Sequence, residues 1–355
     1  MPNTALIADY PHRMGGHCGS GAMRDLLHWN GLGWDGPPSE GLVFALGGAL
    51  SLTYIRSDDL TPPLYLVGRG GDFEVDLPER LGAEAEVLAT DDPHEGWTFV
   101  RDDIDAGRPS LVWADIAELP YLRVQLRMSR HDIVIVGYDD EAGVAFVVDN
   151  DREEVQHVPY DALARARSST SFPQPTRHTT YRITWPAHLP AIASAASSAF
   201  QQSADTMQHP TGTSIAGPPS AGGAHGLSAV TELASDLPTW ADLSTNELEV
   251  HLFSLGAFIE KAGTGGGLFR RLLAEGCSEI ARLTHDSATA DLAVTAERCA
   301  QAWTALARSA VQRDVDAHTR LNATAETAGR LLEAETALIT SLHNASASQA
   351  AACPS

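Results

Sequence analysis

One cysteine of this chain lies in a setting that activates thiols. Cys18 falls within the glycine-rich run of residues 15–21, and a helical pattern begins directly after it. The first turn of a helix offers unpaired backbone N–H groups and the positive end of the helix dipole, and both favour thiolate over thiol. Because the thiolate is the nucleophilic form of cysteine, this pattern predicts a reactive side chain at Cys18.

Two residues far along the chain could complete a nucleophilic centre. His131 stands at the head of an apolar strand pattern, 133–138, and Asp149 follows the next one, 144–148. Turn residues separate the two patterns, which predicts an antiparallel hairpin and places His131 within a few ångströms of Asp149. The imidazole could then accept the thiol proton, while the carboxylate holds the ring in one tautomer.

These residue types also have plainer interpretations. A lone cysteine is commonly a small buried residue, which is how we interpret Cys277 and Cys299. His131 could simply cap its strand, and Asn150 or Asp151 could stand where we place Asp149. The order cysteine, histidine, aspartate on suitable elements favours the catalytic interpretation over each of these taken singly.

An attack by Cys18 would create an oxyanion that needs two hydrogen-bond donors. The backbone N–H of Cys18 is one candidate. For the second donor we consider the side chains of His12 and His17, since no Gln or Asn lies nearby. The same residues could instead hold a metal ion, but no ligand pair recurs with zinc-like spacing, so we expect no metal.

Length, composition and charge narrow the class of protein. The chain has 355 residues, 43% of them hydrophobic, and a formal net charge of −22. This length suits two domains, and the strong acidity disfavours a nucleic-acid partner. The sequence shows neither an apolar run long enough for a membrane nor a signal-peptide pattern, so we expect a cytoplasmic protein without a membrane partner. A homodimer is compatible with these features.

Two kinds of pattern divide the chain. Residues 1–185 mix strand and helix signals, whereas strand signals vanish after residue 186 and apolar spacing becomes helical. We therefore predict an α+β domain over 1–185 and an all-α domain over 187–343. We also predict a mobile loop at 208–226 and a disordered tail at 344–355.

The local patterns predict individual elements as well. Expected strands are 51–55, 64–67, 110–115, 133–138, 144–148 and 155–158. Expected helices are 22–29, 91–106, 190–207, 247–262, 268–284 and 288–342, the last with at least one break.

Several of these segments resemble a known family. Residues 16–27, 44–50, 115–121 and 131–139 are similar to the N-terminal domain of butirosin biosynthesis protein H. The helical region, with its glycine-led run at 262–271, resembles the uncharacterised domain that commonly follows it. The resemblance covers nearly the whole chain.

This resemblance implies a papain-like fold and acyl transfer instead of proteolysis, with Cys18, His131 and Asp149 at the triad positions. The named family member moves an aminoacyl group from an acyl carrier protein thioester to an amine of an aminoglycoside. It implies here an acyl donor on a carrier protein or on coenzyme A, a small-molecule amine acceptor, and a place in antibiotic or other natural-product biosynthesis. Phosphopantetheine would be part of the donor substrate, and no bound cofactor is expected.

Further contacts can be proposed on weaker signals. Candidate substrate contacts are Gly47, Gly48, Tyr121 and Arg270. Arg123, Arg127 and Arg130 are spaced as on one face of a helix and could dock an acidic carrier protein, which this acidic chain would otherwise repel. The same arginines could equally form a solvated surface stripe.

Two other functions remain open on this sequence. The same triad could serve a thioesterase, a cyclase or a cysteine peptidase, with water or an internal group in place of the amine. A protein that only binds or scaffolds, with a decayed papain-like domain, is the alternative outside enzymes.

Overall fold

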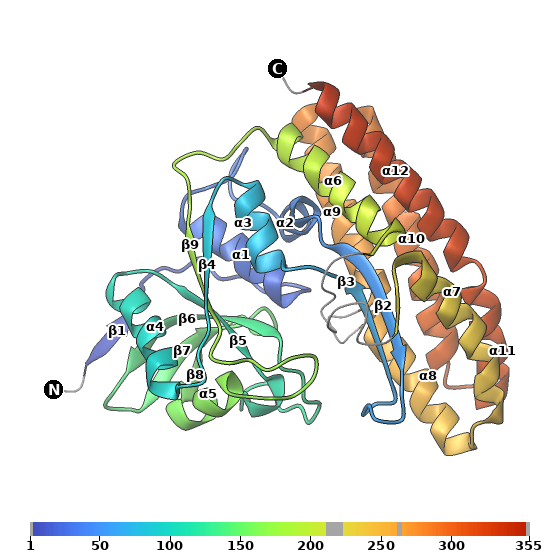
Figure 1. Cartoon of the computed structure of the whole chain (residues 1–355), viewed down its shortest axis with the longest axis horizontal. Coiled ribbons are helices and arrows are strands. Elements are labelled where there is room, and N and C mark those ends of the chain that lie inside the picture. Colours follow the sequence, from blue (N-terminus) through green and yellow to red (C-terminus); the bar gives the residue numbers. More distant parts are fainter. Residues whose placement is uncertain (1–2, 211–222, 261–264, 353–355) are drawn as a thin grey trace. The chain divides into compact units, whose positions relative to one another are not determined.

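The structure, a computed structural model, describes residues 3–210, 223–260 and 265–352, and it divides the chain into two compact units (Figure 1). Met1–Glu40 and Leu81–Leu189 form the first, which we call the mixed unit. Gly41–Arg80 and Pro190–Ser355 form the second, which we call the helical unit. The chain enters the helical unit for the second time at Pro190, close to the boundary predicted near residue 186, whereas no sequence pattern indicated that 41–80 belongs with the helices.

The mixed unit is built on a seven-stranded sheet in which all the pairings are antiparallel. Six strands follow the order β4-β9-β5-β6-β7-β8, and β1 pairs with the part of β6 beyond β5. The strands are β1 (Thr4–Leu6), β4 (Glu84–Leu88), β5 (Ser110–Ala114), β6 (His131–Asp139), β7 (Val144–Val148), β8 (Gln156–Pro159) and β9 (Thr180–Thr184). The helices of this unit are α1 (Cys18–Trp29), α4 (Pro93–Asp105), the 3-10 turn η1 (Ile116–Glu118) and α5 (Tyr160–Arg167).

The predicted hairpin is confirmed as β6 and β7, at the centre of the sheet. Val134 pairs with Val148, so the residues that follow β7 lie opposite the start of β6 at His131. On its other side His131 pairs with Ala114 of β5. The buried apolar residues of these strands thus fix the register that carries His131 and Asp149.

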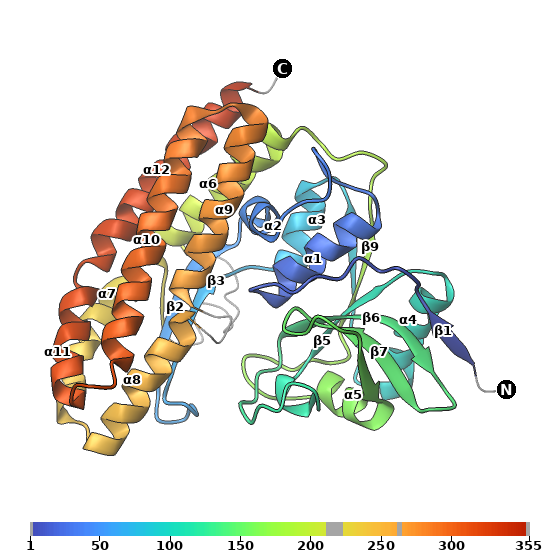
Figure 2. The same cartoon turned by 180° about the vertical axis from the view of Figure 1, so that it is seen from behind.

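The helical unit consists of helices around a small antiparallel sheet in the order β10-β2-β3 (Figure 2). Its strands are β2 (Leu50–Arg56), β3 (Leu64–Arg69) and β10 (Ala224–His225). Its helices are α2 (Glu40–Gly47), α3 (Phe73–Arg80), α6 (Ile192–Gln208), α7 (Gly226–Asp236), the 3-10 turn η3 (Leu237–Asp242), α8 (Thr245–Glu260), α9 (Gly266–Thr284), α10 (Ser287–Val311), α11 (Ala317–Ala328) and α12 (Leu331–Ala352).

The hairpin of β2 and β3 explains why 41–80 joins the helical unit. Every residue of β3 is buried, as are the first five of β2, so both faces of the hairpin need apolar cover. Helices α6, α7, α8 and α9 supply that cover. Arg270 of α9 fixes the position of the hairpin, because its Nη1 donates hydrogen bonds to the carbonyl oxygens of Ser51 and Gly68.

Two predictions about disorder need correction. Residues 344–352 are not a disordered tail but the end of α12, which buries Ala345, Ser346 and Gln349. Of the predicted loop 208–226, residue 208 ends α6, 224–225 form β10 and 226 begins α7, while 211–222 lie outside the described residues. In the described part of the chain, no helix combines the length and apolarity needed to cross a membrane.

Candidate active site

Cys18 is the first residue of α1, so the helical pattern begins at the cysteine itself and not after it. His17 caps this helix, because its side chain accepts a hydrogen bond from the backbone N–H of Ser20. The backbone N–H of Gly21 bonds to the His17 carbonyl oxygen. The N–H groups of Cys18 and Gly19 lie in the first turn, so they have no acceptor within the helix and form part of its positive end.

His131 and Asp149 make the contact that the hairpin predicts. His131 Nε2 lies 2.8 Å from Asp149 Oδ2, and the carboxylate is fully buried while the imidazole keeps 14% of its surface exposed. Tyr121 donates a hydrogen bond of 2.7 Å to the same carboxylate oxygen. The backbone N–H of Asp151 donates to the other oxygen at 3.2 Å. Asp149 is thus held in place from three sides.

The thiol of Cys18 is part of the same group of side chains. Burial by itself would raise the pKa of Cys18, but electrostatic interaction with His17 and hydrogen bonds to His131 and His17 outweigh it and hold the pKa well below its usual value. Burial would lower the pKa of His131, but the charge of Asp149 and hydrogen bonds to Asp149 and Cys18 raise it well above normal. The side chains thus favour a thiolate beside an imidazolium.

A second carboxylate lies beside the sulfur. Asp132 is 1% exposed, and its Oδ2 is 3.7 Å from Cys18 Sγ, within range of a hydrogen bond from the thiol. Both residues line a small cavity of about 10 Å³ behind the nucleophile, room for about one water molecule. Strand alternation places Asp132 and His131 on opposite faces of β6, so the sequence pattern did not indicate that both would approach Cys18.

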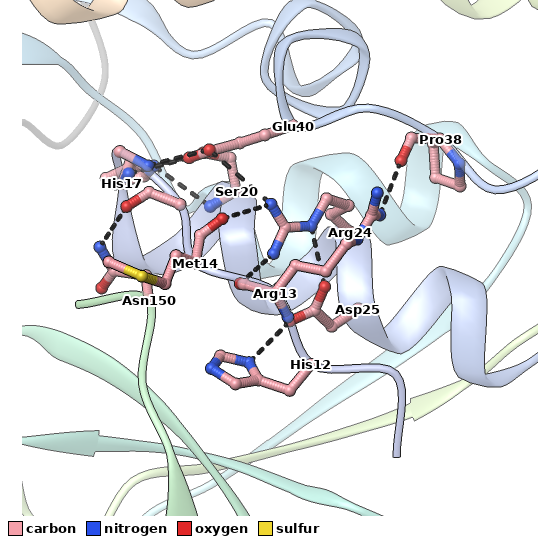
Figure 3. A network of polar contacts seen from close by, with 12 residues as sticks. His12, Arg13, Met14, His17, Ser20, Arg24, Asp25, Pro38, Glu40 and Asn150 are labelled. Atoms are coloured by element: carbon pink, nitrogen blue, oxygen red, sulfur yellow. Dashed lines mark hydrogen bonds and ion pairs between the residues drawn. The ribbon is translucent and has the colours of Figure 1, made fainter. Parts of the chain in front are cut away.

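Glu40 organises the loop that leads into α1 (Figure 3). Its Oε2 accepts from the backbone N–H of Gly16 at 2.9 Å, and its Oε1 accepts from the N–H of His17 at 2.8 Å and from Ser20 Oγ at 3.0 Å. A side chain at Gly15 would collide with this carboxylate, since its Cβ would lie 2.9 Å from Glu40 Oε2. The glycines before Cys18 therefore let one half-buried carboxylate hold the loop.

Asn150 ties the same loop to the hairpin (Figure 3). The backbone N–H of Gly15 donates to the Asn150 carbonyl oxygen at 2.9 Å, and Asn150 Nδ2 donates back to the Gly15 carbonyl oxygen at 3.0 Å. The sequence left Asn150 as a substitute for Asp149. In the structure it holds the nucleophile's loop against the strand end that carries Asp149.

His12 does not have the geometry expected of an oxyanion donor. Its Nδ1 lies 3.0 Å from Asp25 Oδ2 and its Nε2 lies 2.7 Å from the carbonyl oxygen of Arg152. Both acceptors require a ring proton, so neither nitrogen has one to offer a substrate. Asp25 also accepts a hydrogen bond from Arg24, and the three side chains fix the segment before α1 (Figure 3).

His17 remains as a candidate donor. The backbone N–H of Ser20 donates to its Nδ1 at 3.1 Å and so orients the ring. Interaction with this ring lowers the pKa of Cys18. An oriented imidazole therefore lies next to the nucleophile.

The four other predicted substrate contacts lie in different places. Arg270 is fully buried and ion-paired with Glu335 at 2.8 Å, so it cannot bind a substrate. Gly47 lies against the ring of Phe73, where a Cβ would approach to 2.1 Å. Gly48 lines a cavity of the helical unit. Tyr121 lies in the site, but its hydroxyl is used on Asp149.

The three arginines do not share a helical face, because residues 123–130 form no helix. Arg123 has a φ of 55°, which a helix does not allow. Arg130 is buried, with its guanidinium 4.7 Å from the centre of the Trp113 ring. Arg127 is exposed, and its guanidinium lies 3.4 Å from the Glu118 carboxylate. The expected helical face is therefore wrong, and docking of a carrier protein by these arginines stays a prediction.

Comparison with known protein families places both parts of the chain. Residues 17–150 match the family described as butirosin biosynthesis protein H, N-terminal, and residues 161–342 match the domain of unknown function DUF4872. No curated protein matches the chain closely enough to count as a relative. The first match contains all three residues of the candidate triad, and the second covers just over half of the chain. The chain therefore belongs to the family of proteins that resemble butirosin biosynthesis protein H and carry this second domain.

Proposed function

We propose that this protein is a cysteine-dependent acyltransferase of natural-product biosynthesis. It would move an acyl group from the thioester of a carrier protein or of coenzyme A to the amine of a small molecule, through an acyl-enzyme on Cys18. Family membership supports a biosynthetic role of the acyl-transfer kind. The order of Cys18, His131 and Asp149, with an α1 N-terminus facing an antiparallel sheet, supports a papain-like arrangement.

One arrangement carries this proposal: Cys18 lies at the start of a helix, and an imidazole whose Nε2 is held by a buried carboxylate lowers the pKa of its thiol. In the first step the Cys18 thiolate attacks the thioester carbon. As the carbon–sulfur bond to the donor breaks, His131 gives its proton to the departing phosphopantetheine thiolate. The products are a free donor thiol and a thioester on Cys18.

In the second step the acceptor amine attacks the acyl-enzyme. His131, now neutral, takes a proton from the attacking nitrogen, and the bond to Cys18 breaks. The amide leaves, and the thiolate and imidazolium are restored. Asp149 keeps its charge throughout, stabilises the imidazolium and fixes its orientation, while Tyr121 and the backbone N–H of Asp151 hold Asp149.

The oxyanion of both tetrahedral intermediates would lie at the N-terminus of α1. The backbone N–H of Cys18 is one donor, and His17 Nε2–H is our choice for the second. The cap on α1 supports this choice, because it orients the ring beside Cys18.

The test uses thioesters of N-acetylcysteamine, which contains the end of the phosphopantetheine arm common to both donors. Intact-protein mass spectrometry should show one added acyl group on the wild type and on Cys299→Ala, and none on Cys18→Ala. With an amine present, an amide product supports transfer, whereas free acid alone would favour a thioesterase. An acyl group that still forms on Cys18→Ala would overturn the proposal.

A further inference from the structure

The carboxylate of Asp132 lies at the nucleophile, but the proposed reaction gives it no part. Asp132 belongs to β6, whose residues 132–138 are all buried, and it is itself 1% exposed. The run reads Asp-Ile-Val-Ile-Val-Gly-Tyr, so one charged residue heads an uncharged stretch of strand. Burying a carboxylate costs free energy, and such groups gather at functional sites. A role for the charge of Asp132 is therefore worth seeking.

The packing of α1 on the hairpin holds this carboxylate against the sulfur. Asp132 Oδ2 lies 3.7 Å from Cys18 Sγ. Cys18 and Gly21, one turn apart on α1, line the same small cavity as Asp132. The glycine allows the helix to come this close, because a Cβ at Gly21 would lie 3.3 Å from Asn150 Cβ. The short distance thus follows from the backbone positions of the helix and the strand.

Titratable side chains surround the sulfur and its cavity from several elements of the mixed unit. They are His12 and His17 before α1, Asp25 on α1, His131 and Asp132 on β6, and Asp149 after β7. Asp25 accepts a hydrogen bond of 2.8 Å from Arg24 and lies 3.0 Å from His12, so its charge is compensated. Asp149 lies 2.8 Å from the imidazole of His131. Among these carboxylates, Asp132 is the one in contact with the sulfur.

A carboxylate at this place interacts differently with the free and the bonded sulfur. The neutral thiol can donate a hydrogen bond to Asp132 Oδ2, whereas the same oxygen repels a thiolate. In an exchange with a thioester, the thiolate forms a bond to the acyl carbon, and the bond from that carbon to the donor sulfur breaks. The proton of His131 goes to the departing sulfur. Cys18 thereby loses its negative charge, and its repulsion by Asp132 ends.

The imidazolium loses its charge in the same step, which ends any attraction to Asp132. This opposing effect is the smaller one, because strand alternation places His131 and Asp132 on opposite faces of β6. The carboxylate that contacts the imidazole is Asp149. Bonding the sulfur to carbon therefore relieves a net repulsion.

We propose that Asp132 is a positioning residue that destabilises the free thiolate of Cys18 relative to every form in which the sulfur is bonded, and so favours the acyl-enzyme. The part that concerns the acyl-enzyme rests on the proposed function. His17 and His131 make the thiolate available. Asp132 keeps the thiolate from becoming so stable that the acyl group returns to the donor. A thiol whose thiolate is strongly stabilised gives up its bonded partner readily, as oxidising dithiol enzymes show for disulfides.

The first measurement isolates the effect of the charge on the thiolate. It uses the full-length His131→Ala protein, in which the loss of the imidazole raises the pKa of Cys18 into a range where the protein is easily handled. Adding Asp132→Asn should lower the pH midpoint for alkylation of Cys18 by iodoacetamide by about one unit, since a like charge no longer opposes the thiolate. Asp139→Asn, at the other end of β6, is the matched control and should leave the midpoint unchanged. Peptide mass spectrometry identifies the alkylated cysteine.

The second measurement compares the free and the bonded sulfur at equilibrium, with His131 in place. The protein is mixed with bis(2-hydroxyethyl) disulfide and 2-mercaptoethanol at a fixed ratio, so that the Cys18 thiolate forms a mixed disulfide and one 2-mercaptoethanol thiolate leaves. Asp132→Asn should lower the equilibrium constant by about tenfold, the counterpart of one pH unit, and Asp139→Asn should not change it. S-acetyl-N-acetylcysteamine with its free thiol should show the same fall for the acyl-enzyme.

Circular dichroism shows whether each variant is folded, and Asp132→Ser provides a second uncharged variant with a smaller side chain. If the wild type takes no acyl group, the proposed function is refuted, and the disulfide equilibrium still decides the role of Asp132. A midpoint or a disulfide equilibrium that is equal in a folded Asp132 variant and its parent would overturn the proposal.

Discussion

Both units place a cysteine beside a cation and a carboxylate, with opposite results. In the mixed unit His131 helps to lower the pKa of Cys18, and Asp149 Oδ2 lies 2.8 Å from His131 Nε2. In the helical unit Cys299 is beside Glu335, which is ion-paired with Arg270 at 2.8 Å. The pKa of Cys18 lies well below its usual value, whereas burial and the charge of Glu335 raise that of Cys299 well above it.

Each sulfur has both kinds of partner, since Asp132 Oδ2 lies 3.7 Å from Cys18 Sγ and Arg270 acts on Cys299 as well as Glu335 does. The difference lies in the balance of these interactions. At Cys18 the interactions with His17 and His131 outweigh burial, whereas at Cys299 burial and the charge of Glu335 outweigh Arg270. Trp303 Nε1 also donates to Glu335 Oε1, the oxygen that Arg270 contacts. A thiol near a cation and a carboxylate is thus reactive or inert depending on which interactions prevail over burial.

Removing the cation should affect Cys18 most. We expect His131→Ala to slow acylation of Cys18 on the order of 10,000-fold, because the leaving thiolate loses its proton donor. The pH midpoint for alkylation of Cys18 by iodoacetamide should rise towards that of an ordinary thiol, near about 8.5, and in the wild type it should lie well below that. Peptide mass spectrometry identifies the alkylated residue, and alkylation of Cys299 at a rate equal to that of Cys18 would contradict the comparison.

Breaking the pair in the helical unit should change stability instead of reactivity. Glu335→Ala leaves Arg270 as a buried cation without its partner, which typically costs about 3–5 kcal/mol. Urea unfolding followed by circular dichroism measures this loss, while alkylation of Cys18 should keep its pH dependence. Glu326→Ala is the matched control, because its pair with Arg330 is exposed and should contribute below about 0.5 kcal/mol.

A smaller effect should follow from loosening the loop before Cys18. Glu40→Gln keeps the size of the side chain but removes the charge of the carboxylate, which accepts hydrogen bonds from Gly16, His17 and Ser20. We expect acylation to slow by about tenfold, since charge-assisted hydrogen bonds are worth about 1.5–3 kcal/mol. Glu84→Gln, an exposed residue of the same unit, is the control. An equal loss in both variants, or none in Glu40→Gln, would remove Glu40 from the site.

The smallest effect should come from Tyr121→Phe. Burial raises the pKa of Asp149, but the charge of His131 and hydrogen bonds from His131 and Tyr121 outweigh it and keep the pKa low. Losing the hydroxyl should therefore raise this pKa, so that the acid limb of the pH–rate profile moves to higher pH. Acylation at neutral pH should slow by about fivefold, in line with one hydrogen bond of about 1 kcal/mol. An acid limb that does not move would mean that Tyr121 only fills space.

Local patterns predicted the elements well, because strand alternation and helical spacing are local properties. They gave the hairpin of β6 and β7, and from it the contact of His131 with Asp149. The assignment of 41–80 to the first domain was wrong, because the hairpin of β2 and β3 is buried on both faces and the helices that cover it lie far along the chain. The prediction that the arginines of 123–130 share a helical face was wrong, because the spacing of charges does not produce a helix without an apolar stripe to bury.

The site was predictable in part for the same reason. Cys18 and His17 share one helix start, which the glycines indicated. Glu40 and Asn150 act through backbone N–H and carbonyl groups of other segments, and no side-chain pattern records such contacts. Tyr121 was singled out, but its role was not, because its partner Asp149 becomes a neighbour only on folding.

The paired hydrogen bonds between Gly15 and Asn150 have a consequence for the life of the chain. They join segments 135 residues apart, and His131 and Asp149 likewise follow Cys18 by more than a hundred residues. In a nascent chain shorter than this, Cys18 therefore lacks the imidazole of His131, which lowers its pKa in the folded unit. The time at which Cys18 first becomes alkylated at low pH would therefore report when this unit has folded.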